Sequence, residues 1–359
     1  IAEAGMEVAR SQLRNLGGST LSQILAARAG ANLSLSSSTD SANFYANRAF
    51  VTDDVPYVPQ TSFGGGTYRV YLTNAATLTG VSPVETVTSL TDTDLRVTLT
   101  SFGQGPNNSL AVVQGIVKQL TLPPLPGAIV LPGPSVTFNG GNSNASGVAG
   151  GIESAVTLTS EASRQAVIDN LNDIHRIGNY TCTAPPCINN EAATIDPTWN
   201  SASSIEGLYN TLMSQADLVT GTTTGATATT STLTAAQIGT TSNPQIVVVN
   251  GNAVLDGSGG AGILIVTGTL TLKGAFGYTG LIMCIGQGRL NREGAGNGTM
   301  TGSILVANTR NSDNSLRTSL GPSVYNTDGG GNSTITYNAA STSLPVTSRV
   351  FIKTSWKQF

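Results

Sequence analysis

Charged residues are scarce in this sequence. Lysine and arginine together number 17 and aspartate and glutamate 20, so charged residues make up 10% of the 359-residue chain, where a typical soluble protein has about 25%. This scarcity argues against a charge-rich helical bundle, a coiled coil or a typical cytosolic enzyme. The formal net charge is −3. Because phosphate binding is dominated by lysine and arginine, this net charge argues against nucleic acid as a partner.

The sequence has no long hydrophobic run and only one histidine. No stretch approaches the 18 or so consecutive apolar residues of a membrane-spanning helix. The chain begins at Ile1 with neither a methionine nor a signal peptide, so we expect a processed or truncated start. The only histidine, His175, falls at the end of a predicted helix, where it interacts favourably with the helix dipole. No Gly-x-Ser-x-Gly motif accompanies it, and we expect no catalytic role for it.

Cysteine is limited to three residues, two of which lie close together. Cys182 and Cys187 bracket the sequence Thr-Ala-Pro-Pro. This spacing predicts a small disulfide loop and an oxidising compartment; two free thiols are the alternative. A zinc site would need more cysteine or histidine nearby, so we expect no metal. Cys284 stands in the apolar run Leu-Ile-Met-Cys-Ile and is expected to be buried and inert.

Glycine is abundant instead, with 42 residues, and serine, threonine and asparagine fill much of the rest. Such a composition is typical of a β-rich surface protein with many tight turns. The sequence predicts a mainly β chain in three parts. These are an N-terminal helix at 1–31, a β-rich domain at 32–122, and a β-helix domain at 123–359 with an insertion at about 153–243.

The first part is predicted to be a helix because its apolar residues recur at helical spacing. Ile1, Val8, Leu13 and Leu16 are among them, and oppositely charged residues lie between them in a favourable order.

The second part is predicted to form a small antiparallel sheet. Residues 67–72 and 94–100 alternate between apolar and polar side chains, and residues 110–117 form a further apolar run. The proline-rich segment 123–126 cannot pair inside a sheet and is expected at an edge.

The third part contains a repeat. Gly262, Gly280 and Gly302 each open an apolar strand and lie 18 and 22 residues apart, and residues 246–255 look like an earlier copy. Each copy combines strands with glycine corners, which predicts the stacked parallel rungs of a β-helix, or solenoid. An ordinary antiparallel meander is the alternative. The insertion is expected to hold two helices, the disulfide loop and a threonine-rich connector at 220–234.

Carboxylates in the repeat are the candidates for an enzyme that cleaves polysaccharides, because glycoside cleavage uses two of them at a fixed separation. Asp256 and Glu293 flank corners of the repeat. Arg289, Arg292 and Glu293 form its one charged patch, which we interpret as a solvated face with a local ion pair.

Other acidic and glycine-rich segments give no stronger signal. The acidic pairs at 53–54 and at Asp92 and Asp94 lie far from the repeat in the sequence. The glycine runs at 64–66 and 329–331 lack the lysine and serine or threonine of a phosphate-binding loop. We therefore expect no catalytic residue, no metal and no cofactor; calcium at Asp256 or Asp328 is the alternative.

Three stretches resemble a known family. Residues 2–9 (Ala-Glu-Ala-Gly-Met-Glu-Val-Ala), residues 138–144 and the C-terminal part from Gly280 to Phe359 are similar to PilX-type pilus assembly proteins, minor-pilin-like relatives of type IV pilins. The resemblance implies a prepilin peptidase substrate that an upstream hydrophobic helix holds in the membrane before it joins a pilus at or near the tip. That upstream segment and the cleavage motif are not in this sequence.

The resemblance also implies a place for the N-terminal helix and a location for the protein. The helix would pack against other pilin subunits through Ile1, Val8, Leu13 and Leu16, and the protein would be exposed at the cell surface. The leading hypothesis is a non-enzymatic component of a type IV pilus or pseudopilus. It would act in assembly, adhesion or both, with a surface or a polysaccharide as ligand. The alternatives are a secreted β-helix adhesin or fibre protein, and a polysaccharide-active β-helix enzyme.

Overall fold

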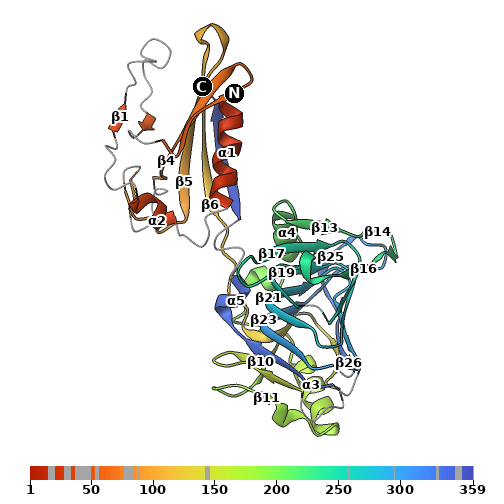
Figure 1. The fold of residues 1–359 in the computed structure, drawn as a ribbon. Coiled ribbons are helices and arrows are strands. Elements are labelled where there is room, and N and C mark those ends of the chain that lie inside the picture. Colours follow the sequence, from red (N-terminus) through yellow and green to blue (C-terminus); the bar gives the residue numbers. More distant parts are fainter. Residues whose placement is uncertain are drawn as a thin grey trace. The chain divides into compact units, whose positions relative to one another are not determined.

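The computed structural model describes most of the chain, which divides into two compact units (Figure 1). The first unit comprises residues 1–121 and 346–359, and the second residues 122–345. The described residues are 1–14, 21–27, 34–36, 50–52, 56–76, 84–86, 89–141, 146–257, 259–294, 296–328, 331–343 and 350–358. The mainly β class, with an N-terminal helix, an antiparallel sheet and parallel sheets, is confirmed.

The first unit is built on a five-stranded antiparallel sheet in the order β28-β6-β5-β4-β3. The strands are β3 (Val58–Phe63), β4 (Gly66–Asn74), β5 (Arg96–Gln104), β6 (Leu110–Gln119) and β28 (Phe351–Gln358). Gly64 and Gly65 join β3 to β4 with φ of 59° and 79°, because a two-residue hairpin of type I′ needs positive φ at both central positions. The sheet contains the alternating segments that the sequence singles out.

The N-terminal helix α1 (Ala2–Arg14) packs on this sheet (Figure 1). Its buried residues recur every three or four positions, as a helix with one apolar face requires: Ala2, Gly5, Met6, Ala9 and Leu13. All of them except Gly5 join one core cluster with apolar residues of β4, β5, β6 and β28. A second helix, α2 (Leu21–Ala26), contributes Leu21 and Leu25 to the same core.

The short elements of the first unit are β1 (Ser34–Ser36), β2 (Phe50–Thr52) and the 3-10 turn η2 (Pro106–Asn108). β1 and β2 pair antiparallel.

The second unit contains a six-stranded parallel sheet in the order β16-β18-β20-β22-β26-β8. Its strands are β16 (Thr230–Leu233), β18 (Asn252–Asp256), β20 (Thr269–Lys273), β22 (Arg289–Glu293), β26 (Ser323–Asp328) and β8 (Val136–Asn139).

A larger, eleven-stranded parallel sheet completes the framework of this unit. Its main path is β11 (Tyr180–Thr181), β9 (Gly147–Ala149), β27 (Ser333–Tyr337), β23 (Gly298–Val306), β21 (Gly277–Cys284), β19 (Gly259–Val266), β17 (Gln245–Val249) and β13 (Leu218–Thr220). Off this path lie β7 (Gly127–Leu131), β10 (Ser154–Leu158) and β12 (Ile188–Asn190).

Consecutive strands from β17 to β23 alternate between the two sheets, as rungs would. The repeat glycines fall in register, with Gly262 opposite Gly280 and Gly280 opposite Gly302. Every pairing along these strands is parallel, so the alternative of an antiparallel meander is wrong here. The closed coil of a β-helix goes beyond this pairing and stays a prediction.

The remaining elements of the second unit are mostly short. They are α3 (Glu161–Asp173), α4 (Ala202–Met213), α5 (Ala339–Ser343), η3 (Ile177–Asn179), η4 (Pro197–Trp199), η5 (Ala235–Gln237), β14 (Thr223–Thr224), β15 (Thr227–Ala228), β24 (Asn308–Arg310) and β25 (Leu316–Gly321). Ser160 and Ser201 cap α3 and α4 by accepting hydrogen bonds from backbone N–H groups in the first turns. A disulfide joins Cys182 to Cys187, as expected from their spacing.

Three segments lie differently from the sequence-based expectation. The last strand, β28, pairs with β6 and so belongs to the first unit rather than to the domain at 123–359. Residues 153–243 contribute strands to both parallel sheets instead of standing apart as an insertion. The threonine-rich tract at 220–234 forms β14, β15 and β16, of which β16 pairs with β18.

Candidate functional site

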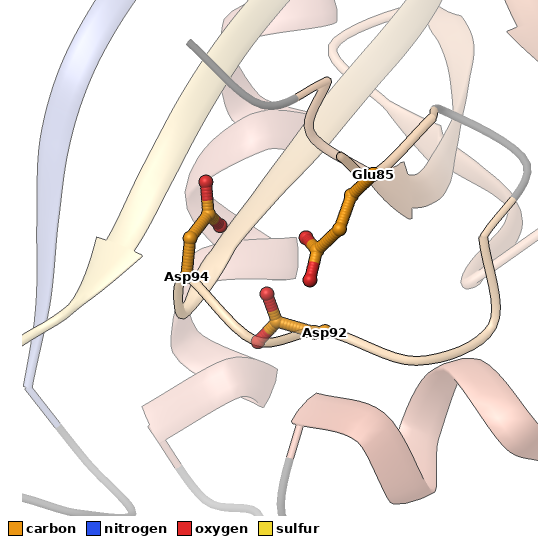
Figure 2. Close-up of side chains that lie close together, drawn as sticks. All are labelled: Glu85, Asp92 and Asp94. Carbon is orange, nitrogen blue, oxygen red and sulfur yellow. The ribbon is translucent and has the colours of Figure 1, made fainter. Parts of the chain in front are cut away.

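Three carboxylates gather in the first unit, in the segment that precedes β5 (Figure 2). Asp92 and Asp94 lie in the loop that enters β5, and Glu85 lies in the preceding segment 84–86. One carboxylate oxygen of each residue lies within 4.8 Å of the others. Glu85 and Asp92 point toward each other in Figure 2. We call Glu85, Asp92 and Asp94 the carboxylate cluster.

Neighbouring elements fix the backbone of this loop. The Ser22 hydroxyl, on α2, donates to Asp92 O at 3.0 Å and accepts from Asp92 N at 3.1 Å. The side-chain amide of Asn74, at the end of β4, donates to Thr91 O at 2.9 Å. Since α2 and β4 both hold the loop, the acidic side chains are placed by packing and hydrogen bonding rather than by free movement in solvent.

Burial and hydrogen bonding differ among the three acids. Glu85 and Asp92 are only 5% and 8% exposed. Glu85 Oε1 accepts hydrogen bonds from the backbone N–H and the hydroxyl of Thr93. The backbone N–H of Arg96 donates to Asp92 Oδ1 at 3.2 Å and to Asp94 Oδ1 at 3.0 Å. Asp92 Oδ2 is buried and has no hydrogen-bond partner among the residues that the structure describes.

The electrostatics of the cluster combine an ion pair with like charges. Arg96 Nη1 lies 3.4 Å from Asp94 Oδ2 and forms an ion pair with it. Burial is the largest cause that raises the pKa of the Asp92 carboxyl from 3.8 to about 6. The negative charges of Glu85 and Asp94 act in the same direction, and the backbone hydrogen bond from Arg96 acts against them. The cluster can therefore hold a proton or a cation.

The donor set decides which cation would fit. All three groups offer carboxylate oxygen and none offers nitrogen or sulfur, which suits a hard divalent ion such as Ca²⁺, Mg²⁺ or Mn²⁺. An open hollow of about 390 Å³ lies beside the cluster and is lined in part by Glu85 and Thr93.

The sequence revealed only part of this cluster. It shows Asp92 and Asp94 as an acidic pair but leaves out Glu85, which stands seven residues before Asp92 in a segment with no regular pattern. The pair at 53–54 lies outside the described residues.

The residues of the charged patch predicted on the repeat do not share one face of β22. Alternation along β22 leaves Arg289 exposed and buries Arg292 to 5% exposure. Arg292 donates hydrogen bonds of 3.2 Å each to Ser146 Oγ, Gly296 O and Gly331 O. The interpretation of the patch as a solvated face is therefore wrong for Arg292.

The acidic residues of the repeat form a ladder with a lysine. In the parallel register Asp256 stands opposite Lys273, and Lys273 opposite Glu293. Lys273 Nζ lies 3.3 Å from Glu293 Oε2. Asp256 and Glu293 are thus two strand spacings apart, about 9.6 Å, with the lysine strand between them.

The other residues singled out in the sequence lie as follows. His175 follows α3 and is exposed. Its backbone N–H donates to Asn172 O at 3.0 Å. Cys284 is fully buried, as expected, and burial raises the pKa of its thiol above the ordinary value.

The residues expected to pack in a filament differ in exposure. Leu13 is fully buried in the core of the first unit, while Ile1 and Val8 are half-buried and pack against that core. Leu13 therefore has no surface left for a neighbouring subunit. Leu16 lies outside the described residues. No helix within the described ranges combines the length and apolar character that crossing a membrane requires.

These features define a mainly β protein with a helix-on-sheet unit, a parallel-sheet unit and an acidic cluster beside β5. No protein-family model and no curated protein matches the chain. Among solved structures, the chain is similar to the competence-associated pilin ComZ from Thermus thermophilus, with 11% identity and a TM-score of 0.20 over 87% of this chain and 89% of that chain. A TM-score this low carries no argument about function.

Proposed function

We propose that this chain is a non-enzymatic, pilin-related component of a type IV pilus or pseudopilus, exposed at the bacterial cell surface. The observation that carries the proposal is the place of residues 2–9 in the fold. These residues bear the resemblance to PilX-type proteins, and they form the first turns of α1. One face of α1 packs on an antiparallel sheet, and the opposite face remains for other contacts.

The hydrogen bonding of α1 is compatible with a longer helix. The N–H of Gly5 donates to Ile1 O at 3.2 Å, so the helical pattern includes the first residue. A hydrophobic segment before Ile1, which the resemblance implies, would extend this helix. Ile1 and Val8, both half-buried, would then contact neighbouring pilin subunits, and the upstream segment would hold the protein in the membrane before assembly.

The six-stranded sheet offers a surface for adhesion. The parallel register sets Thr271, Asn291, Asn326 and Asn139 in one column. All four are partly exposed and uncharged, and Asn139 Nδ2 donates to Asn326 Oδ1 at 2.9 Å. Amide and hydroxyl groups in a row can donate and accept hydrogen bonds, which suits a polysaccharide or a hydroxyl-rich surface as ligand.

A non-enzymatic role is supported by the repeat. Its candidate acids, Asp256 and Glu293, flank Lys273 in the register, and Lys273 forms an ion pair with Glu293. Such a ladder accounts for these charges without a reaction. If polysaccharide panels are nevertheless cleaved, and if Asp256→Asn or Arg289→Ala abolishes the cleavage, then the chain is an enzyme.

The experiment that tests the proposal determines the intact mass and N-terminal sequence of the native protein from membrane and sheared-surface fractions. We expect a mature N-terminus about 20 hydrophobic residues before Ile1, with a methylated first residue. A native start near Ile1, found only in the medium, would overturn the pilus assignment in favour of a secreted β-helix adhesin.

A deletion strain tests the role in the cell. We expect loss of surface piliation, of attachment, or of both, and recovery when the full-length gene is supplied. Replacing Asn291 and Asn326 by alanine should reduce attachment but leave piliation unchanged. Piliation and attachment both at the parental level in the deletion strain would contradict the proposal.

A further inference from the structure

The carboxylate cluster contains an oxygen that the described protein groups leave unsatisfied. Asp92 is 8% exposed, and its Oδ2 has no hydrogen-bond partner. Asp92 also points toward Glu85 within the cluster (Figure 2). A buried carboxylate oxygen without a partner costs free energy, because it has lost its hydration and gained nothing in return. Something that binds oxygen is needed to make this arrangement favourable.

The charge around Asp92 favours a cation. The carboxylate of Asp92 lies beside those of Glu85 and Asp94. Arg96 directs its guanidinium to Asp94, and the side chains of Ser22 and Asn74, which hold the loop, are neutral. A cation bound at Asp92 Oδ2 would supply the opposite charge that this oxygen lacks among the described residues.

The separation of the oxygens allows one ion to bind all three groups. Two oxygens bound to the same Ca²⁺ at about 2.4 Å lie at most about 4.8 Å apart, and the cluster oxygens lie within 4.8 Å of one another. Ca²⁺ accepts irregular shells of oxygen ligands, whereas Mg²⁺ demands a near-ideal octahedron, so carboxylates placed by the hydrogen bonds of the loop favour Ca²⁺.

We propose that Glu85, Asp92 and Asp94 form a binding site for a single Ca²⁺ ion. Each residue contributes a carboxylate oxygen, with Asp92 supplying its Oδ2. Water that enters through the adjacent hollow completes the coordination shell. The ion joins the segment 84–86 to the loop before β5 and so stabilises the first unit. The site is independent of the pilus assignment.

The test uses the full-length chain after treatment with a chelator. Calorimetric titration with CaCl₂ at neutral pH should show about one equivalent of Ca²⁺ bound, with weaker binding of MgCl₂. The temperature of unfolding should rise with Ca²⁺ concentration, because an ion that binds only the folded state stabilises it by mass action. No uptake of Ca²⁺ by the wild-type chain would overturn the proposal.

Matched variants locate the ion. Asp92→Asn keeps the shape of the side chain but removes its charge, and we expect Ca²⁺ affinity to fall about 10- to 100-fold or more. Asp94→Asn provides a second variant in case the first does not fold. Asp328→Asn, which changes an exposed aspartate of the second unit, should bind Ca²⁺ like wild type. Unchanged affinity in both cluster variants would overturn the assignment.

Discussion

The side chain of Glu206 shows how much a single buried charge can contribute to this fold. Glu206 is 6% exposed on α4, and its Oε2 lies 2.7 Å from Arg310 Nη2. The Thr309 hydroxyl and Arg310 Nε also donate to its Oε1, at 2.6 and 2.9 Å. Arg310 lies in turn over the ring of Tyr209, 5.4 Å from its centroid. Each charge therefore depends on the other for its solvation.

Replacing Glu206 by alanine should destabilise the second unit by about 3–5 kcal/mol, because the variant leaves the Arg310 guanidinium partly buried without its counterion. Urea unfolding gives the change in free energy. The control is Glu161→Ala, since Glu161 pairs with Arg164 at 2.7 Å but is 64% exposed; its loss should cost about 0–1 kcal/mol. Equal effects of the two variants would refute the role assigned to Glu206.

Asp92 gives a pH dependence of opposite sign to that of an ordinary ion-paired carboxylate. Its pKa is about 6 in the folded chain and near 3.8 when unfolded, so the folded state binds the proton more tightly. Without divalent cations, the contribution of Asp92 to stability should be fully present below about pH 4, decline as the pH rises toward 6, and be lost above that pH. Urea midpoints measured across this range in chelator should show the decline, and Asp92→Asn should remove it. Parallel curves for wild type and variant would contradict the assignment.

At the residue scale, the candidate site could be predicted only in part. Asp92 and Asp94 are neighbours in sequence, so an acidic pair is visible without a structure. The participation of Glu85 depends on how two loop segments meet, which no periodic pattern encodes. The burial of Arg292 was missed for another reason: alternation along β22 carries it inward, where backbone carbonyls accept its hydrogen bonds.

Among the elements, the parallel strands of the repeat are those that the sequence predicts best. Gly262, Gly280 and Gly302 lie within β19, β21 and β23 and stand directly opposite one another in the sheet. Gly280 has a φ of 140°, and a Cβ at this position would lie 2.0 Å from Gly262 O. Because a residue with a side chain does not fit at such a position, the spacing of the glycines in the sequence revealed the register of the paired strands. The tract at 220–234 has no such glycine signal, and its strands were missed.

Gly280→Ala should therefore disturb the stack of β19, β21 and β23. We expect the free energy of unfolding to fall by roughly 1–3 kcal/mol from backbone strain alone, and by more because of the clash with the preceding strand, β19. Gly207→Ala is the matched control, because Gly207 lies in α4 and a Cβ there meets no atom within 4 Å. That variant should gain about 0.5–1 kcal/mol. Thermal and urea unfolding compare the two variants. An unchanged free energy of unfolding in Gly280→Ala would show that the close approach of the neighbouring strands does not require glycine at this position.

At the scale of the whole molecule, the chain leaves the first unit after β6 and returns to it in β28. Residues 122–345, rather than 153–243, are thus inserted between two paired strands. The sequence could not show this, because the partner of β28 lies more than 200 residues earlier and pairing across such a distance leaves no local pattern. The proline-rich segment that follows β6 marks where the chain departs.

The two ends of this insertion meet in the sheet. Gln119 stands opposite Phe351 in the antiparallel register, and Leu120 N donates to Val350 O at 2.8 Å. The chain could therefore pass from β6 to β28 through a two-residue hairpin turn, for which Asn-Gly is the favoured sequence. The carboxylate cluster and the face of α1 both lie in the part that such a hairpin would retain.

Replacing residues 121–349 by Asn-Gly should give a first unit that folds alone, because its core cluster draws every residue from 1–121 and 346–359. Circular dichroism and urea unfolding should show a cooperative β-rich domain, and Ca²⁺ should still stabilise it. In cells, when fused to the upstream hydrophobic segment that the proposed function requires, this variant should join the pilus but lose attachment. Asp94→Asn in the same background should lose only the Ca²⁺ effect. A shortened chain that stays unfolded in Ca²⁺ would show that the first unit depends on residues 122–345.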